Sequence, residues 1–172
     1  MRIYSIKRPI NTGTYPRSNR YQVLEIRNFE KKDYVPEIDS EAWGYIDYES
    51  DVPENILKNY ELVSQEYIIL ENWKNIYKAF SVANLQNKGP KEIAVYLSKK
   101  MSSQILKNCF AAYIQVKHCN DKISNENIKW LEKGRVKEKV EANDVLNHMN
   151  SNSIQPVYVN QLINELRKCS LG

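Results

Sequence analysis

The sequence predicts an α+β protein in which a small β-rich module, residues 1–64, precedes a helical domain of three to four helices, residues 65–172. Two observations support this prediction. Before Ser64, short stretches of alternating apolar and polar residues are separated by turns that contain Gly and Pro, a pattern typical of strands. From Glu66 onward, apolar residues recur at steps of three and four, which is the period of an amphipathic helix.

Three short strands and one helical turn are expected in the N-terminal module, over residues 2–8, 21–27, 42–48 and 53–60. The first strand ends at Pro9, because proline lacks the N–H that a strand ladder uses. Gly13 and Pro16 predict a turn before the second strand. Pro53 suits the first position of a helix, so the short helical turn begins there.

The first helix of the helical domain is expected to begin at Glu66 and to end at the sequence Asn87-Lys88-Gly89-Pro90, which combines a flexible residue with a missing hydrogen-bond donor. A second long helix follows from Pro90. Its apolar residues stand at four-residue steps from Ile93 to Cys109, and the face continues to Val116.

Ser124 is a typical N-cap and predicts the start of a third helix. Gly134 weakens this helix by about 1 kcal/mol relative to alanine, so a break there is expected. Residues 147–156 have the composition of a polar linker, and residues 158–166 predict a short amphipathic helix at the end of the chain.

Composition indicates a globular protein that stays in the cytoplasm of its host. Hydrophobic residues make up 42% and charged residues 27% of the chain, and no apolar run approaches the ~20 residues of a membrane span. The first residues lack the apolar core of a signal peptide. Three cysteines, an odd number, suit a reducing compartment.

Charge is distributed in three blocks. Residues 1–32 carry a net charge of +6, residues 33–65 carry −8, and the remainder carries +6. Such segregation points to charged partners, or to docking of one block on another, and carries no information about the fold.

The sequence offers no recognisable catalytic or cofactor motif, so we expect a protein that is not an enzyme and holds no cofactor and no metal. The spacing of the cysteines and histidines fits no zinc site; these residues are Cys109, His118, Cys119, His148 and Cys169. Cys109 lies on an apolar helix face and is expected in the core. Neither of the glycine-rich motifs that bind phosphate is present.

Two basic clusters are candidate contacts for a partner or for nucleic acid, because lysine and arginine beside aromatic rings suit phosphates and bases. The candidates are Arg8, Arg17 and Arg20 in the first cluster, and Lys129, Lys133, Arg135 and Lys137 in the second, beside Trp130. Two other interpretations remain open. Lysines coat the solvent face of any soluble helix, and the first cluster can simply neutralise the acidic block.

An acidic belt in residues 33–54 is a candidate surface for a partner that normally binds nucleic acid, because carboxylates pair with the arginines that otherwise contact phosphate. We define the acidic belt as Asp33, Glu37, Asp39, Glu41, Asp47, Glu49 and Asp51. It can equally be a solubilising edge beside a sheet. A small metal-dependent hydrolase site in this segment is a further alternative.

Several motifs of the first third of the chain resemble a short module found in anti-defence proteins of phages and conjugative elements of Gram-positive bacteria. The motifs are Arg8-Pro9, Gly13-Thr14-Tyr15-Pro16, Asn28-Phe29, Glu41-Ala42-Trp43-Gly44-Tyr45-Ile46-Asp47-Tyr48 and Tyr60-Glu61-Leu62-Val63. Some proteins of this appearance are relatives of a phage defence-against-restriction protein, and others are type II-A anti-CRISPR proteins. The N-terminal module is therefore expected to be like that of the defence-against-restriction proteins.

This resemblance implies an inhibitor that binds a host defence nuclease, most specifically Cas9 with its guide RNA, and blocks DNA binding or cleavage. The acidic belt would then occupy the positively charged channel of the nuclease, or the arginines that read the short motif beside the target. The alternative is a nucleic-acid-binding accessory protein of a phage or conjugative element, acting through the basic clusters.

Overall fold

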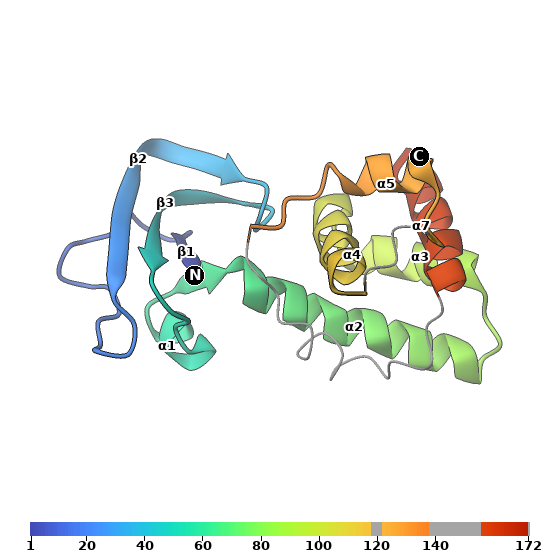
Figure 1. The fold of residues 1–172 in the computed structure, drawn as a ribbon, viewed down its shortest axis with the longest axis horizontal. Helices are drawn as coiled ribbons and strands as arrows, with labels where there is room; N and C mark the ends of the chain where they lie inside the picture. Colours follow the sequence, from blue (N-terminus) through green and yellow to red (C-terminus); the bar gives the residue numbers. More distant parts are fainter. Residues whose placement is uncertain (118–121, 138–155, 172) are drawn as a thin grey trace. The chain divides into compact units, whose positions relative to one another are not determined.

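The computed structural model describes residues 1–117, 122–137 and 156–171. The chain divides into two compact units, Met1–Ile68 and Ile69–Gly172, which we call the β unit and the helical unit. The predicted α+β class is confirmed, because an antiparallel sheet is followed by helices (Figure 1). None of the described helices is long and apolar enough to cross a membrane.

The β unit contains four antiparallel strands in the order β2-β3-β1-β4 and one short helix. Their bounds are β1 Arg2–Ser5, β2 Val23–Val35, β3 Ser40–Tyr48, α1 Glu54–Asn59 and β4 Leu62–Ser64. The three predicted strands and the helical turn after Pro53 are present, but β1 ends at Ser5, ahead of the predicted residue 8, and β2 runs eight residues past Arg27. Strand β4 was not predicted. Its pairing with β3 shifts register between Asn28 and Asp33, and this irregularity hides the strand from a search for strict alternation.

Apolar side chains fill both faces of this sheet. In β1, Ile3 and Tyr4 point to opposite faces because successive strand residues alternate. Ile3 packs in a cluster with Ile46 and Tyr48, and Tyr4 packs in a second cluster with Tyr45. Both faces of the sheet are thereby largely covered at β1 and β3, whereas most residues of β2 are exposed.

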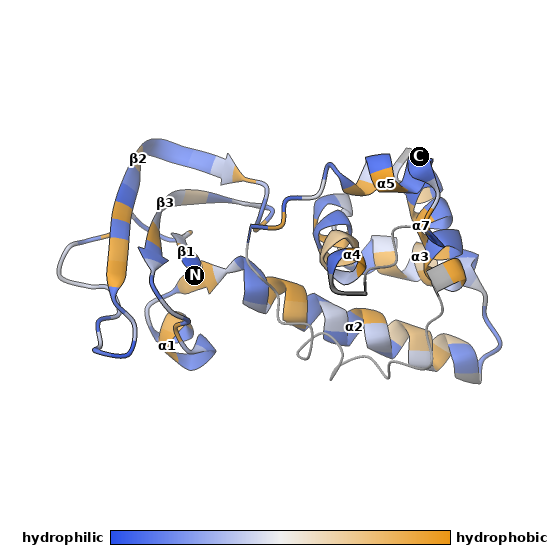
Figure 2. Ribbon diagram, viewed as in Figure 1, coloured by the Kyte–Doolittle hydropathy of each residue, from blue (hydrophilic) through white to orange (hydrophobic). Residues whose placement is uncertain are grey.

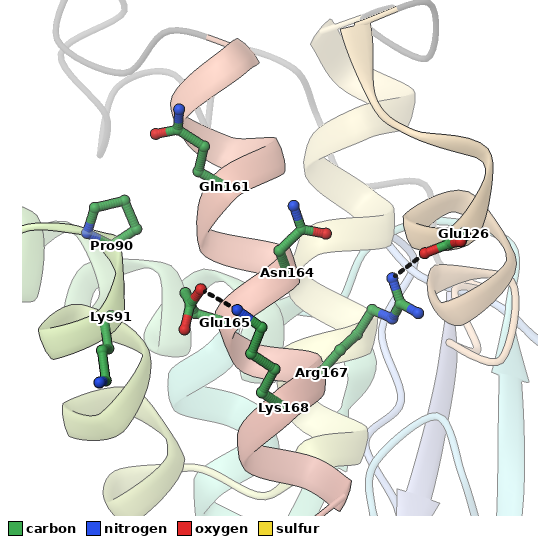
Figure 3. A pocket seen from close by; sticks show the side chains of 8 residues that line it. All are labelled: Pro90, Lys91, Glu126, Gln161, Asn164, Glu165, Arg167 and Lys168. Atoms are coloured by element: carbon green, nitrogen blue, oxygen red, sulfur yellow. Dashed lines mark hydrogen bonds and ion pairs between the residues drawn. The ribbon is translucent and has the colours of Figure 1, made fainter.

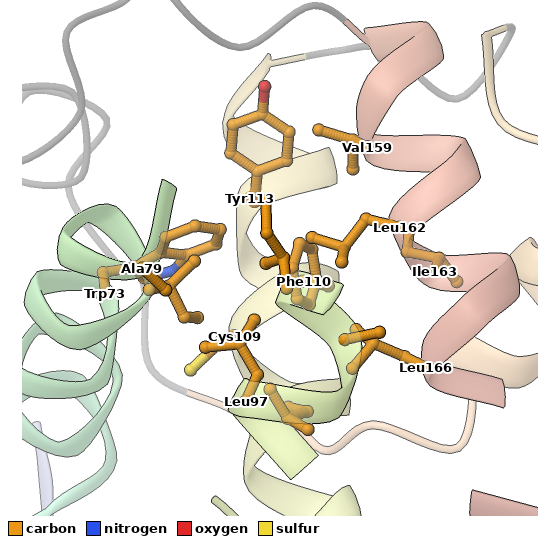
Figure 4. Close-up of a cluster of buried hydrophobic side chains, with 14 of the residues drawn as sticks. Trp73, Ala79, Leu97, Cys109, Phe110, Tyr113, Val159, Leu162, Ile163 and Leu166 are labelled. Atoms are coloured by element: carbon orange, nitrogen blue, oxygen red, sulfur yellow. The ribbon is translucent and has the colours of Figure 1, made fainter. Parts of the chain in front are cut away.

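The helical unit is built from five described helices, with bounds α2 Gln65–Leu85, α3 Pro90–Lys100, α4 Ser103–Lys117, α5 Asn125–Leu131 and α7 Pro156–Leu171. Apolar and polar residues alternate along them with helical periodicity (Figure 2). Side chains from α2, α3, α4 and α7 meet in one core (Figure 4). In α7, for example, Val159, Leu162, Ile163 and Leu166 form one buried face.

The second helix of the prediction is two helices, and the prediction of a single one is wrong. Met101 has an extended backbone, with φ −132° and ψ 146°, and ends α3. The Ser102 hydroxyl then accepts a hydrogen bond from the Ile105 N–H at 3.1 Å and caps α4. The apolar face passes through this break without interruption, because Leu97, Met101 and Leu106 are all buried. For this reason periodicity alone cannot detect the break.

Of the other predicted helices, the last is longer than the predicted residues 158–166, because α7 runs from Pro156 to Leu171. The predicted end of the first helix and the predicted start of the third are confirmed. After α2, Asn87 adopts a left-handed conformation with φ 53° and the Lys88 N–H bonds to the Ala83 carbonyl at 2.8 Å, which ends the helix. Ser124 caps α5, and that helix ends at Leu131, ahead of Gly134. The linker predicted over residues 147–156 lies, up to residue 155, outside the described residues.

Candidate functional site

The acidic belt is divided between the two ends of strand β3. Asp33, Glu37, Asp39 and Glu41 gather at the β2–β3 hairpin, where Val35 pairs with Ser40. Asp47 lies six residues beyond Glu41, which corresponds to about 20 Å along a strand. Glu49 and Asp51 follow the end of β3 and are exposed. The acidic belt is therefore not one continuous surface.

The carboxylates at the hairpin differ in how freely a partner can reach them. Asp33 and Glu41 are exposed, whereas Glu37 is 7% exposed. Asp39, at the turn with φ 46°, accepts a 2.7 Å hydrogen bond from the Tyr34 hydroxyl. Partial burial and this hydrogen bond raise the pKa of Tyr34 to about 12. An exposed tyrosine thus lies opposite the exposed Glu41 in the register of the two strands and next to Asp33 in sequence.

Asp47 has a structural role within the sheet. Its two carboxylate oxygens each accept a 2.7 Å hydrogen bond from the Arg2 guanidinium, and the two side chains are only 26% and 22% exposed. The same guanidinium lies 3.8 Å from the centre of the Tyr45 ring. The hydrogen bonds that Arg2 donates to Asp47, and the nearby carboxylate charge, raise the pKa of Arg2 despite its partial burial. Asp47 is consequently not available to a partner.

We expect Asp47→Asn to lower the free energy of unfolding of the β unit by about 2 kcal/mol, because a half-buried arginine loses its counter-charge in a bidentate pair. The control is Glu41→Gln, which also removes one negative charge of the acidic belt from β3, but at an exposed position. It should lower the free energy of unfolding by less than about 0.5 kcal/mol. Urea unfolding of both variants measures the difference. Equal losses would contradict the structural role of Asp47.

The basic residues of the N-terminal cluster are exposed and are engaged within the β unit. Arg8 faces Glu61 at 3.3 Å, and the Arg17 guanidinium lies 4.4 Å from the centre of the Tyr15 ring. Arg20 is exposed at a turn. Together with the Arg2–Asp47 pair, the Arg8–Glu61 pair links the basic block to the acidic one. These contacts agree with the interpretation that the first cluster neutralises the acidic block.

A groove of about 450 Å³ between α4, α5 and α7 collects part of the second basic cluster. Its charged and aromatic lining residues are Lys107, Glu126, Lys129, Trp130, Lys133 and Arg167. We call this the basic groove. Lys129 and Lys133 were predicted from the sequence; Arg135 and Lys137 are exposed and do not line it.

Lys133 is presented to the basic groove by a loop that α4 fixes in place. The buried side chain of Asn108 accepts a 2.8 Å hydrogen bond from the Arg135 N–H, and Gln104 donates to the Lys133 carbonyl at 3.3 Å. Gly134 lies against α4 so closely that a Cβ there would be 2.9 Å from the Lys107 carbonyl oxygen. Glycine is required at this position for space.

Arg167 is fixed from the opposite side by α5. Its Nη1 donates to the Asn127 Oδ1 at 3.0 Å and lies 3.3 Å from a carboxylate oxygen of Glu126 (Figure 3). Asn127 is fully buried and donates in turn to the Asn160 side chain at 2.7 Å. The sequence carried a signal for Arg167, because it lies four residues after Ile163 on the buried face of α7.

Cys109 is fully buried in the core, as predicted, and burial raises the pKa of its thiol. Cys169 packs against the same core, whereas His118, Cys119 and His148 lie outside the described residues. Among residues 1–117, 122–137 and 156–171, no three His, Cys, Asp or Glu side chains are grouped so that they could hold a metal ion.

Comparison with known proteins gives a match for the β unit. No curated protein and no solved structure matches the chain. Residues 1–66 match the model of a family described as "Defence against restriction A C-terminal". The module therefore corresponds to the C-terminal part of that family and not to an N-terminal one. The match supports an anti-restriction, anti-defence family for residues 1–66, and it does not single out proteins that act against CRISPR nucleases.

Proposed function

We propose that this protein is a non-enzymatic inhibitor that binds a bacterial defence nuclease, and that its target is Cas9 loaded with guide RNA. The observation that carries an anti-defence role is the match of residues 1–66 to the defence-against-restriction family. The choice of Cas9 rests on the resemblance of the N-terminal motifs to type II-A anti-CRISPR proteins. Cas9 holds nucleic acid in a positively charged channel and reads the motif beside its target with arginines.

The hairpin end of the β unit is the surface that we propose for this contact. There, the exposed Glu41 lies opposite Tyr34 in the register of β2 and β3, and Tyr34 is 51% exposed. Asp33, also exposed, precedes Tyr34 and points to the other face of the strand. Carboxylates beside a rigid tyrosine suit a surface rich in arginine, since the former form charge-assisted hydrogen bonds and the latter supplies buried area. At the other end of β3, Glu49 and Asp51 are also exposed, and changes of charge there provide the comparison.

Titration of the purified protein into a Cas9–guide DNA-cleavage reaction tests the proposal. We expect cleavage to stop near one equivalent of protein, because an inhibitor that binds is consumed stoichiometrically. Inhibition at far less than one equivalent would contradict a non-enzymatic mechanism. A restriction nuclease assayed in parallel separates the targets: inhibition of that enzyme alone would show that the choice of Cas9 is wrong, and inhibition of neither would refute the proposal.

Two matched charge reversals test the proposed surface. Asp33→Lys with Glu41→Lys changes the hairpin end, and Glu49→Lys with Asp51→Lys makes the same change in charge at the other end of β3. All four positions are exposed, so both double variants should fold. We expect the first variant to lose inhibition and the second to retain it. The reverse result would move the contact to the other end of the β unit.

A further inference from the structure

The basic groove has an excess of positive charge that its own residues do not neutralise. Among the described residues that line it, four basic side chains accompany one carboxylate, that of Glu126. Within the described part of the chain, Glu126 pairs with Arg167 at 3.3 Å, and its side chain is 79% exposed, so water screens it. Lys107, Lys129 and Lys133 therefore remain as cations around a cavity of about 450 Å³.

The pKa of Lys107 is lowered in this environment. Burial lowers the pKa of this lysine, and the neighbouring charge of Lys133 lowers it further. An anion bound between them would offset both effects, because it stabilises the charged form of each lysine. The basic groove therefore has the electrostatics of a site that is completed by a negative ligand.

The groove is also pre-organised for a ligand. Hydrogen bonds from Gln104 and to Asn108 fix the loop that carries Lys133, and buried Asn127 fixes Arg167. Arg167, whose side chain is held before binding, therefore loses little conformational entropy on binding. The Ser103 and Ser170 hydroxyls, 3.2 Å apart, line the same groove and add neutral polar groups to it.

Two further features favour a polymer of phosphates over a single small anion. Trp130 lines the groove with the Lys107 amine 5.3 Å from the centre of its ring, which combines a cation with an aromatic surface. A second groove of about 530 Å³ adjoins the first, because Glu126 and Arg167 line both (Figure 3). It adds Lys91 and Lys168, but Lys168 is paired with Glu165, which also lines this groove, at 2.7 Å. Lys91 is therefore the residue that adds positive charge past the first cavity.

We infer that the basic groove of the helical unit binds the phosphate backbone of a single-stranded nucleic acid. A positively charged groove with an aromatic lining is the arrangement by which proteins hold single strands without reading their sequence. This site lies wholly within residues 103–170, outside the segment that matches the anti-restriction family, and it does not depend on the proposed inhibition of a nuclease.

Fluorescence anisotropy with the full chain and a labelled single-stranded oligonucleotide of about 10 nucleotides tests the inference directly. The groove variant is Lys129→Gln with Lys133→Gln. The matched control is Lys74→Gln with Lys99→Gln, which removes two exposed lysines of the same unit that do not line the groove. We expect the groove variant to bind about tenfold more weakly and its salt slope to fall by about 1.4, since each lost phosphate contact accounts for about 0.7 on a single strand.

The control should keep the affinity and the slope of the natural protein between about 50 and about 200 mM salt. Equal weakening of both variants, or no binding by the natural protein, would overturn the inference. Tighter binding of a duplex of the same sequence would overturn the assignment to single strands. Equal binding of poly-glutamate would show that the groove accepts an acidic protein surface instead. None of these measurements involves a nuclease, so failure here and failure of the proposed inhibition are distinguishable.

Discussion

Trp73→Ala is expected to lower the free energy of unfolding of the helical unit by about 4 kcal/mol, which is in the range for truncating a buried aromatic residue. Trp73 is fully buried, and its ring centre lies 5.4 Å from that of Phe110 and 5.4 Å from that of Tyr113 (Figure 4). It therefore joins α2 to α4 through two aromatic contacts. Removal of the indole leaves a cavity whose walls belong to both helices, and such walls collapse only in part.

Trp73→Phe should cost much less, about 1 to 2 kcal/mol. In the described part of the chain, the indole N–H is a buried donor with no hydrogen-bond partner, and an unsatisfied buried donor costs about 1–3 kcal/mol. Phenylalanine keeps most of the aromatic contacts and removes that donor, so two opposite effects partly cancel. Urea unfolding followed by far-UV circular dichroism measures both variants. Tyr96→Ala, at a site 52% exposed on α3, should change stability by less than about 0.5 kcal/mol and serves as control. Similar losses for Trp73→Ala and Tyr96→Ala would contradict the central place of Trp73.

The α+β class and most elements could be predicted because local signals determine them. Ser124 caps a helix where the sequence indicates, and the stretch from residue 87 to Pro90 ends α2. The end of α3 could not be found in the same way, because Met101 continues the apolar face while its backbone becomes extended. The signal for the start of α4 is the cap at Ser102, and a search for apolar periodicity does not detect a cap.

The candidate sites were less predictable, because they depend on contacts between residues far apart in the chain. Counting charges in sequence joins Asp47 to the acidic belt, but its pairing with Arg2, 45 residues away, gives it a structural role. For the basic groove, the structure instead adds residues to those that the sequence predicts. Lys129 and Lys133 are four residues apart in sequence. Lys107 on α4 and Arg167 on α7 join them only because both helices pack against α5.

Gly44→Ala is expected to lower the free energy of unfolding of the β unit by about 3 kcal/mol, at the upper end of the cost of overpacking. Gly44 lies in the middle of β3 opposite Asn28, at the point where β2 shifts register. A Cβ at this position would be 2.2 Å from the Arg27 carbonyl oxygen and 2.9 Å from the Asn28 Cα. Both atoms belong to the backbone, so no side chain can rotate away, and the two strands must separate or β2 must bend.

The matched control is Gly13→Ala, because a Cβ there would have no neighbour closer than 3.9 Å, the Asn11 side chain, and neither glycine has a positive φ. Its stability should stay within about 0.5 kcal/mol of the natural protein. Thermal unfolding of the two variants measures the contrast. If Gly44→Ala unfolds like Gly13→Ala, the close approach of β2 and β3 is wrong.

The same pair also separates the two proposed activities: residues 1–66 contain Gly44 and match the anti-restriction family, whereas the basic groove lies elsewhere in the chain. We therefore expect Gly44→Ala to lose nuclease inhibition and to retain the binding of single-stranded nucleic acid.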